Sequence, residues 1–278
     1  MVPCHGGQSH GGHAHGGHSR TGRRRPSTAP RLSPRTRLLC PNTTATVRAN
    51  LSSSMPGAPE PFETLRWEAG APAAEAGGFV RLRAHLSRLT RACNYLSIDF
   101  SATEARACLL AAAQHFEGPT RVRLLVTRSG ALHLTSSPLA SATSSVLDVG
   151  VAFERVNEDD PLRRHKTTAR EVYDLASKKA AVLGLADIVF LNLRDNVAEG
   201  AISNVFVRRG AILVTPPVSA GALPGVLRGA LIATGECVEA EVSLANLEKG
   251  DFYLGSSLRG LRPARLAPGI VSVATKPN

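Results

Sequence analysis

The chain has 278 residues, of which 43% are apolar and 20% are charged, and its formal net charge is +11. This length is sufficient for one large domain or two smaller ones with a buried core. Residues 1–59 contain eight of the 33 basic side chains and none of the 22 acidic ones, so the remainder carries only +3. The charge excess therefore belongs to the first 59 residues and does not predict a nucleic-acid-binding surface on the folded part.

Residues 1–59 have a low-complexity sequence, with histidines among glycine pairs followed by arginine, serine and proline. Such a segment buries too little apolar surface to offset the entropy of ordering, so we expect a disordered tail. Its histidines could bind a metal ion, although their spacing defines no site, and its arginines and serines could form an organellar transit peptide. We favour a dispensable extension without a metal site.

The remaining composition indicates an ordinary soluble protein. The five cysteines are scattered without a C-x-x-C pair, which argues against a disulfide framework and a zinc site. No apolar run is long enough to span a membrane. We therefore expect a cytoplasmic protein, or an organellar one if the tail is a transit peptide.

The first part of the folded chain is expected to be a small α/β subdomain of residues 60–140. Alternation of apolar and polar residues, helical spacing and turn residues give its elements. In order, we predict a strand at 62–67, a strand at 79–82, a helix at 85–96, a helix at 101–115, and a hairpin of strands 121–127 and 131–134.

A stretch rich in serine, alanine and threonine, residues 136–145, predicts a linker to a larger subdomain of residues 141–278. Helices and strands do not alternate regularly there, so the fold class is α+β in two subdomains. The predicted elements are strands 146–153, 187–191, 201–207, 212–215, 238–242 and 252–255, and helices 168–183, 226–233 and 244–247.

Lys166 is the first candidate for a catalytic residue. It lies between His165 and two threonines, directly before a predicted helix. A lysine becomes a Schiff-base nucleophile when burial or nearby positive charge lowers its pKa, and Arg163, Arg164 and Arg170 are close in sequence. An exposed basic loop would have the same local sequence.

Three other segments have residues suited to binding. Glu199 precedes an apolar strand, where a buried carboxylate needs a partner such as a protonated pyridine nitrogen, although Arg208 or solvent could serve. The Pro-Gly turn before Val226 leaves free amides at a helix start, which suit a phosphate, but many such turns bind nothing. The polar loop 256–260 could offer hydroxyls or could be a simple turn.

Taken in register, four motifs resemble the fold-type IV pyridoxal-phosphate enzymes of the class IV aminotransferase family. They are Phe-Glu-Thr-Leu-Arg-Trp at 62–67, His-Leu-Ser-Arg-Leu at 85–89, His-Lys-Thr-Thr at 165–168 and Ser-Leu-Arg-Gly at 257–260. The most similar form is aminodeoxychorismate lyase, as in the C-terminal domain of fused aminodeoxychorismate synthase–lyase proteins. The resemblance implies a D-amino-acid-aminotransferase-like fold, pyridoxal 5′-phosphate as cofactor, and a homodimer.

The resemblance also implies residue roles. Lys166 would be the Schiff-base lysine and proton shuttle, and Glu199 would pair with the pyridine nitrogen. The phosphate would be held by Arg88, by the amides of Val226 and Leu227, and by the Ser257 hydroxyl. Ser203 and Asn204 would line the cofactor cleft, and Thr64, His165 and Arg259 would bind substrate carboxylates. Ser256 departs from the asparagine more usual in the related loop.

Two reactions share this scaffold, and both need the lysine and the cofactor as electron sink. We favour a lyase that converts 4-amino-4-deoxychorismate to 4-aminobenzoate and pyruvate in folate biosynthesis, with an aminodeoxychorismate synthase as a candidate partner. The alternative is an aminotransferase for a branched-chain or D-amino acid. A second alternative is a non-catalytic relative whose tail binds a metal or a partner.

Overall fold

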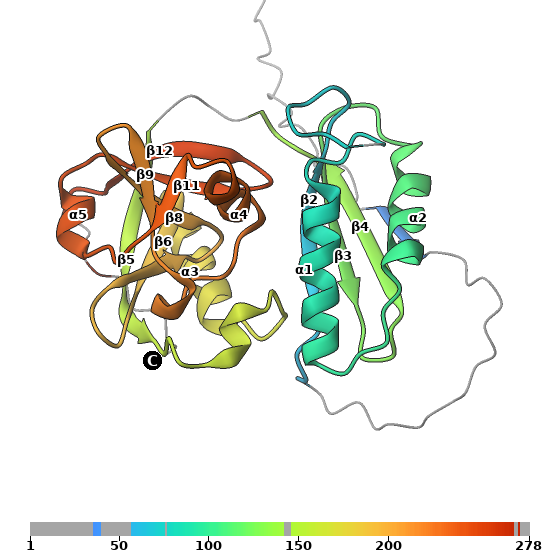
Figure 1. Ribbon diagram of the computed structural model, residues 1–278, viewed down its shortest axis with the longest axis horizontal. Coiled ribbons are helices and arrows are strands. Elements are labelled where there is room, and N and C mark those ends of the chain that lie inside the picture. The colour runs from blue at the N-terminus through green and yellow to red at the C-terminus, as the bar shows by residue number, and fades with distance from the viewer. Residues whose placement is uncertain (1–35, 40–56, 76, 142–145, 270–271, 273–278) are drawn as a thin grey trace, which may run out of the picture. The chain divides into compact units, whose positions relative to one another are not determined.

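The computed structural model of the protein describes residues 36–39, 57–75, 77–141, 146–269 and 272 (Figure 1). The described residues form an α+β fold with two sheets. One sheet has four strands in the order β1-β4-β3-β2, and the other has eight in the order β10-β9-β8-β11-β12-β5-β6-β7. Within this part of the chain, no helix is long and apolar enough to cross a membrane.

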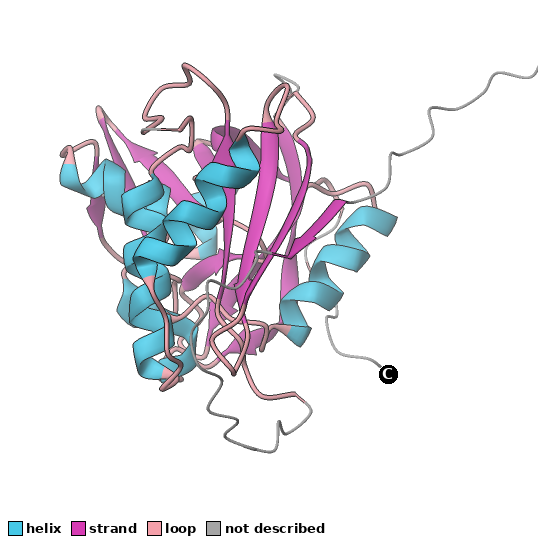
Figure 2. Cartoon of the chain, turned by 90° about the vertical axis from the view of Figure 1, so that its right-hand side faces the viewer, coloured by secondary structure: helices cyan, strands magenta, loops and turns pink. Residues whose placement is uncertain are grey.

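The four-stranded sheet is antiparallel and is built on alternating side chains. Its central strand β3 (Thr120–Val126) buries every second residue, as expected for a sheet with one covered face. Helices α1 (Leu82–Tyr95) and α2 (Ala102–Ala113) supply the cover through a shared apolar cluster that includes Leu65, Leu89 and Leu109. Strands β2 (Phe62–Trp67) and β4 (Leu132–Pro138) flank β3. Figure 2 shows these helices and strands from the side.

The fourth strand was not predicted. Strand β1 (Thr36–Leu39) pairs antiparallel with β4, from Thr36 opposite Ser136 to Leu39 opposite His133. The expectation that residues 1–59 are without structure was therefore wrong for these four residues. Without β1, strand β4 would lie at the edge of the sheet, and an edge strand presents free backbone groups that accept a partner almost independently of that partner's sequence. Residues 1–35 and 40–56 of the predicted tail lie outside the described residues.

The eight-stranded sheet mixes both strand directions. Strand β5 pairs in parallel with β6 and β12, and β9 pairs in parallel with β10, whereas the other pairs are antiparallel. Its strands are β5 (Leu147–Val156), β6 (Asp187–Asn192), β7 (Val197–Gly200), β8 (Asn204–Arg209), β9 (Ile212–Thr215), β10 (Cys237–Glu239), β11 (Phe252–Ser256) and β12 (Gly260–Leu266). Its helices are α3 (Glu171–Val182), α4 (Val226–Ala233) and α5 (Leu244–Glu248), with 3-10 turns η1 (Pro161–Arg164) and η2 (Val218–Ala220).

Some predicted elements differ from the structure, and some strands were not predicted. The strand expected at 79–82 is reduced to isolated bridges at Phe79 and Val80, because Leu82 already begins α1. Of the strand expected at 201–207, only residues 204–207 lie in a strand, β8. Glu199 lies inside β7, a strand that was not predicted, rather than before a strand. Strand β12 was not predicted. The strands that were not predicted depend on pairing with distant segments, which the local residue pattern does not reveal.

The linker expected at 136–145 begins later than predicted, since β4 continues to Pro138 and residues 142–145 lie outside the described residues. The division into subdomains near residue 140 stays a prediction. Among the cysteines, Cys93 and Cys237 are free, whereas Cys108 is disulfide-bonded. The expectation of unpaired cysteines was wrong for Cys108, because pairing depends on distance in space and not on spacing in sequence.

Candidate active site

A cavity of about 740 Å³ collects every predicted site residue. Its lining comes from β2, α1 and β3, from the segment before α3, from the β7–β8 turn, from the start of α4 and from the β11–β12 turn. The predicted residues in the lining are Thr64, Arg88, His165, Lys166, Glu199, Ser203, Asn204, Val226, Leu227, Ser257 and Arg259. Segments far apart in sequence therefore meet at one place.

Lys166 lies in the extended stretch between η1 and α3. Its carbonyl accepts a hydrogen bond from the Phe62 amide (3.0 Å), and its Nζ lies 4.5 Å from the centre of the Phe62 ring. Burial, followed by the positive charges of Arg88 and Arg170, lowers the pKa of Lys166 to about 7. The expected neighbouring charge is thus provided chiefly by Arg88 and Arg170, not by Arg163 or Arg164. A large fraction of the amine is neutral and nucleophilic at neutral pH.

Arg88 is held at one end of the cavity by a buried carboxylate that the sequence analysis did not single out. Arg88 Nε donates to Glu63 Oε1 and Nη2 donates to Oε2, both at 2.7 Å. Its Nη1 donates to the Pro224 carbonyl (3.3 Å). Burial alone would raise the pKa of Glu63, but Arg88 and His85 together hold it well below its usual range. Glu63 is therefore ionised and fixes the guanidinium in place.

His85 extends the same network to the β11–β12 turn. Its Nδ1 lies 2.7 Å from Glu63 Oε2 and its Nε2 lies 2.9 Å from Ser257 Oγ. Burial lowers the pKa of His85, with Arg88 and Lys166 acting in the same direction and Glu63 opposing. The exposed fractions of Glu63, His85, Arg88 and Ser257 are 1%, 1%, 6% and 8%, so water does not compete for these bonds.

The start of α4 faces this end of the cavity. Gly225 is the N-cap residue and offers no side-chain cap, so the first amides of the helix, Val226 and Leu227, have no capping partner among the described side chains. A β-carbon at Gly225 would lie 1.8 Å from Asn204 Oδ1, so only glycine fits there. Asn204 in turn donates its amide to the Leu223 carbonyl (2.9 Å). Free amides at a helix start, beside an arginine, form an anion-binding site.

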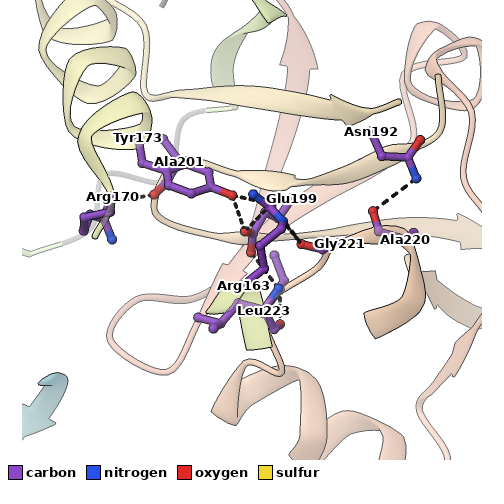
Figure 3. A network of polar contacts seen from close by, with 10 residues as sticks. Arg163, Arg170, Tyr173, Asn192, Glu199, Ala201, Ala220, Gly221 and Leu223 are labelled. Carbon is purple, nitrogen blue, oxygen red and sulfur yellow. Dashed lines mark hydrogen bonds and ion pairs between the residues drawn. The ribbon is translucent and has the colours of Figure 1, made fainter. Parts of the chain in front are cut away.

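Glu199 lies at the other end, inside β7 (Figure 3). Its Oε1 accepts from Tyr173 Oη (2.8 Å) and Arg163 Nη2 (3.2 Å), and its Oε2 accepts from the Leu223 amide (2.9 Å). Burial nonetheless raises the pKa of Glu199, since Arg163 and the hydrogen bonds compensate only in part. This carboxylate would be stabilised further by one more cation.

Arg163 and Tyr173 are the residues around Glu199 whose contacts the sequence analysis missed. Arg163 donates to the Gly221 carbonyl through Nη2 (2.9 Å) and Nε (3.1 Å), and it also contacts the Tyr173 hydroxyl. Figure 3 shows Arg163 between Glu199 and Gly221. Tyr173 is three residues into α3, a position on a helix that has no sequence signal of its own. Its hydroxyl keeps its proton because burial and the charge of Glu199 raise its pKa.

Ser203 lines the cavity and also makes a hydrogen bond that was not predicted. Its hydroxyl donates to Oδ2 of Asp187 (2.6 Å), a buried carboxylate at the start of β6. Arg170 holds the same β7–β8 turn from the other side by donating to the Ala201 carbonyl (2.9 Å). Burial raises the pKa of Asp187 to about 6. The pair therefore fixes the turn that follows Glu199.

The predicted substrate residues lie in a lining with many cations. His165 is stacked on Tyr95, with ring centres 4.2 Å apart, and Arg259 is exposed in the β11–β12 turn. Arg121, Arg123 and Arg262 were not predicted but also line the cavity, and the Arg123 guanidinium lies 3.6 Å from the centre of the Phe62 ring. Alternation along β3 places Arg121 and Arg123 on the same face.

Comparison with known proteins supports the resemblance of the four motifs to the class IV aminotransferase family. The family model for amino-transferase class IV matches residues 60–267. The chain belongs to this class IV aminotransferase family.

The proteins to which this chain is similar are named for different activities. A probable branched-chain-amino-acid aminotransferase of Thermotoga maritima is 28% identical over 218 residues, which cover 73% of this chain and 76% of that protein. A putative amino-acid aminotransferase of Mesorhizobium loti has a TM-score of 0.69 and 31% identity, covering 75% of this chain and all of that one. A putative 4-amino-4-deoxychorismate lyase of Legionella pneumophila has a TM-score of 0.64 and 21% identity, with coverages of 78% and 86%.

Enzymes of this family use pyridoxal phosphate, and solved structures of similar fold include forms with it bound. The cavity of this class IV member fits that cofactor by its donor set. A phosphate ester needs hydrogen-bond donors, which Arg88 and the first amides of α4 supply. An aldehyde needs a partly neutral amine, which Lys166 supplies, and a protonated pyridine nitrogen needs a carboxylate short of positive charge, which Glu199 supplies.

Proposed function

We propose that this protein is a 4-amino-4-deoxychorismate lyase, with Lys166 as its catalytic residue. The observation that carries the proposal is the arginine-rich lining beside Lys166, formed by Arg121, Arg123, Arg259 and Arg262. 4-Amino-4-deoxychorismate has two carboxylates, one on its ring and one on its enolpyruvyl group. Arginine pairs with carboxylates through two parallel hydrogen bonds, so such a lining suits a substrate with two negative groups.

The proposed division of labour follows from the contacts around the cavity. Arg88 and the amides of Val226 and Leu227 would hold the cofactor phosphate, Ser257 would add its hydroxyl, and Glu199 would pair with the ring nitrogen. Asn204 fixes the loop before α4, while Ser203 and Asp187 fix the turn after Glu199. Thr64, His165 and Arg259 line the substrate side. Bound pyridoxal phosphate acts as the electron sink for the reaction.

Lys166 moves the proton. Because its pKa is about 7, the neutral form of Nζ can take a proton from the substrate carbon that bears the amine. The bond between the neighbouring carbon and the enolpyruvyl oxygen then breaks, and the oxygen keeps the electron pair. Protonated Lys166 returns the proton to the departing enolpyruvate, so 4-aminobenzoate and pyruvate leave with all atoms accounted for.

An aminotransferase is the second candidate, because the Thermotoga maritima relative is named as a branched-chain enzyme. Such an enzyme would use the same Lys166 and Glu199 but would need an apolar pocket for the substrate side chain. Phe62, Leu162 and Val172 contribute apolar surface to the lining. From the family resemblance we further propose a homodimer and an association with an aminodeoxychorismate synthase.

One experiment tests both the site and the reaction. The purified protein is reduced with borohydride and its peptides are mapped, and a pyridoxyl adduct is expected on Lys166. An unreduced portion of the same preparation is given 4-amino-4-deoxychorismate, or a branched-chain or D-amino acid with a keto-acid acceptor. Release of 4-aminobenzoate and pyruvate from 4-amino-4-deoxychorismate is expected, with no keto acid formed from the amino acids. Keto-acid formation alone would replace the lyase by the aminotransferase, and an unlabelled Lys166 would remove both.

A further inference from the structure

The network of Glu63, His85 and Ser257 fixes where its protons lie. Glu63 is ionised, so it can only accept, and His85 Nδ1 must donate to it (2.7 Å). His85 is neutral near pH 7, because burial lowers its pKa, so Nε2 has no proton. Nε2 can then only accept, and the Ser257 hydroxyl, 2.9 Å away, must donate to it.

This arrangement directs the one proton of Ser257 at His85 Nε2, so that the proton is not available to another acceptor in the cavity. A phosphate dianion is purely an acceptor and needs donors from the residues around it. Arg88 and the amides of Val226 and Leu227 are donors, but Ser257 would present only lone pairs to the phosphate. Ser257 lies in the cavity lining and contacts His85, so the orientation of its hydroxyl matters for binding.

We propose that binding of a phosphate monoester dianion drives uptake of one proton from solvent by Nε2 of His85, which turns the Ser257 hydroxyl around so that it donates to the phosphate. No covalent bond other than the new N–H bond is formed or broken. The proton offsets part of the negative charge that the dianion brings into a buried cluster. This inference rests on the proposed placement of the cofactor phosphate beside Arg88 and α4.

The charged groups that face His85 determine whether its ring is neutral or protonated. Glu63 on β2 favours the protonated ring, whereas Arg88 on α1 and Lys166 before α3 oppose it. Ser257, from the β11–β12 turn, is uncharged and only relays the effect. A dianion added beside Arg88 and Ser257 shifts this balance toward the protonated ring, because opposite charge nearby favours the charged form.

Calorimetric titration of the apoprotein at pH 7.5, in two buffers with different ionisation enthalpies, measures the protons taken up. Pyridoxal phosphate and pyridoxal are compared, because they share the aldehyde and differ only in the phosphate. At this pH the phosphate is almost entirely a dianion. We expect pyridoxal phosphate to take up about 0.5 to 1 proton more than pyridoxal. A difference near zero, or a net release, would overturn the inference.

Two variants separate this role from a merely structural one. Ser257→Ala and His85→Gln are both expected to bind pyridoxal phosphate more weakly and to lose the extra proton uptake, and Ser257→Ala keeps the test valid if His85→Gln does not fold. His115→Gln, on an exposed histidine, should retain the uptake. A Ser257→Ala protein with undiminished uptake would contradict the relay. If pyridoxal phosphate and inorganic phosphate both fail to saturate the wild-type protein, the proposed phosphate site fails first.

Discussion

Glu63 and Glu199 are both buried carboxylates on strands beside the same cavity, with exposed fractions of 1% and 7%, yet their pKa values shift in opposite directions. Burial acts against ionisation in both. Glu63 has Arg88 at 2.7 Å through two hydrogen bonds, with His85 as a further partner, and its pKa falls. Glu199 has one arginine at 3.2 Å, and its pKa rises.

The comparison shows how one residue type serves two purposes. Glu63 has all the positive charge that it needs, so its effect is to fix Arg88 and His85 in position. Glu199 is left short of positive charge and is therefore the better place for a cationic ring nitrogen. Lys166 lies near both carboxylates, and each of them raises its pKa against the effect of burial.

Removing the Lys166 side chain should have the largest effect on activity, because Lys166 is the proposed catalytic residue and lies near both Glu63 and Glu199. Lys166→Ala should lower turnover by at least about 10³-fold, since a nucleophile and a proton carrier are lost together. Borohydride reduction should no longer attach the cofactor. Lys178→Ala, at an exposed position on α3, should behave as wild type. Residual turnover close to wild type would refute the assignment of Lys166.

Glu63→Gln should destabilise the protein by about 3–5 kcal/mol, because Arg88 would remain buried without its counter-charge. Urea unfolding of the variant measures this loss, and Glu117→Gln, at an exposed position, should change stability by less than about 0.5 kcal/mol. The pKa of Glu63 is depressed, so its stabilisation is complete above the usual range of a glutamate and is lost only in strong acid. A stability gap that closes by pH 5 would contradict this account.

Arg163→Met should increase the difference between the surroundings of Glu63 and those of Glu199. Glu199 would lose its arginine, its pKa should rise further, and the Gly221 carbonyl would lose two hydrogen bonds. We expect a loss of about 1.5–3 kcal/mol in stability together with weaker cofactor binding. Arg194→Met is the matched control, since Arg194 also joins a glutamate, Glu158, to a carbonyl, that of Ser219, outside the cavity lining. Equal losses of cofactor affinity in both variants would argue against a role at the site.

Replacing Asp187 should have the smallest effect, which is a change in how the stability of the protein depends on pH. Its pKa is raised to about 6 in the folded protein, so the folded state holds the proton more tightly and stability falls as the pH rises from about 4 to 6. Asp187→Asn has no such titration. Relative to wild type, the free energy of unfolding of Asp187→Asn should therefore increase by about 2 kcal/mol as the pH rises from about 4 to 6. Thermal unfolding of both apoproteins at several pH values measures the difference, and parallel curves would refute the raised pKa.

The sequence by itself determined the local elements and the family. The alternation in 62–67 and the turn before Val226 predicted β2 and α4 with their observed bounds, because both depend on neighbouring residues. The motif around Lys166 was recognisable because its residues are contiguous. These features need only the period of a strand or a helix, or the identity of adjacent side chains.

Only the tertiary structure decided which charges meet. His85 and Ser257 are 172 residues apart, and Arg163 and Glu199 are 36 apart, so no spacing rule predicts either contact. The same holds for β1 against β4 and for the arginines of β3 in the cavity. A pKa depends on burial and on charges within a few ångströms, and long-range packing sets both. The sequence therefore singled out Lys166 as the candidate, whereas the fold sets its burial and the charges around it.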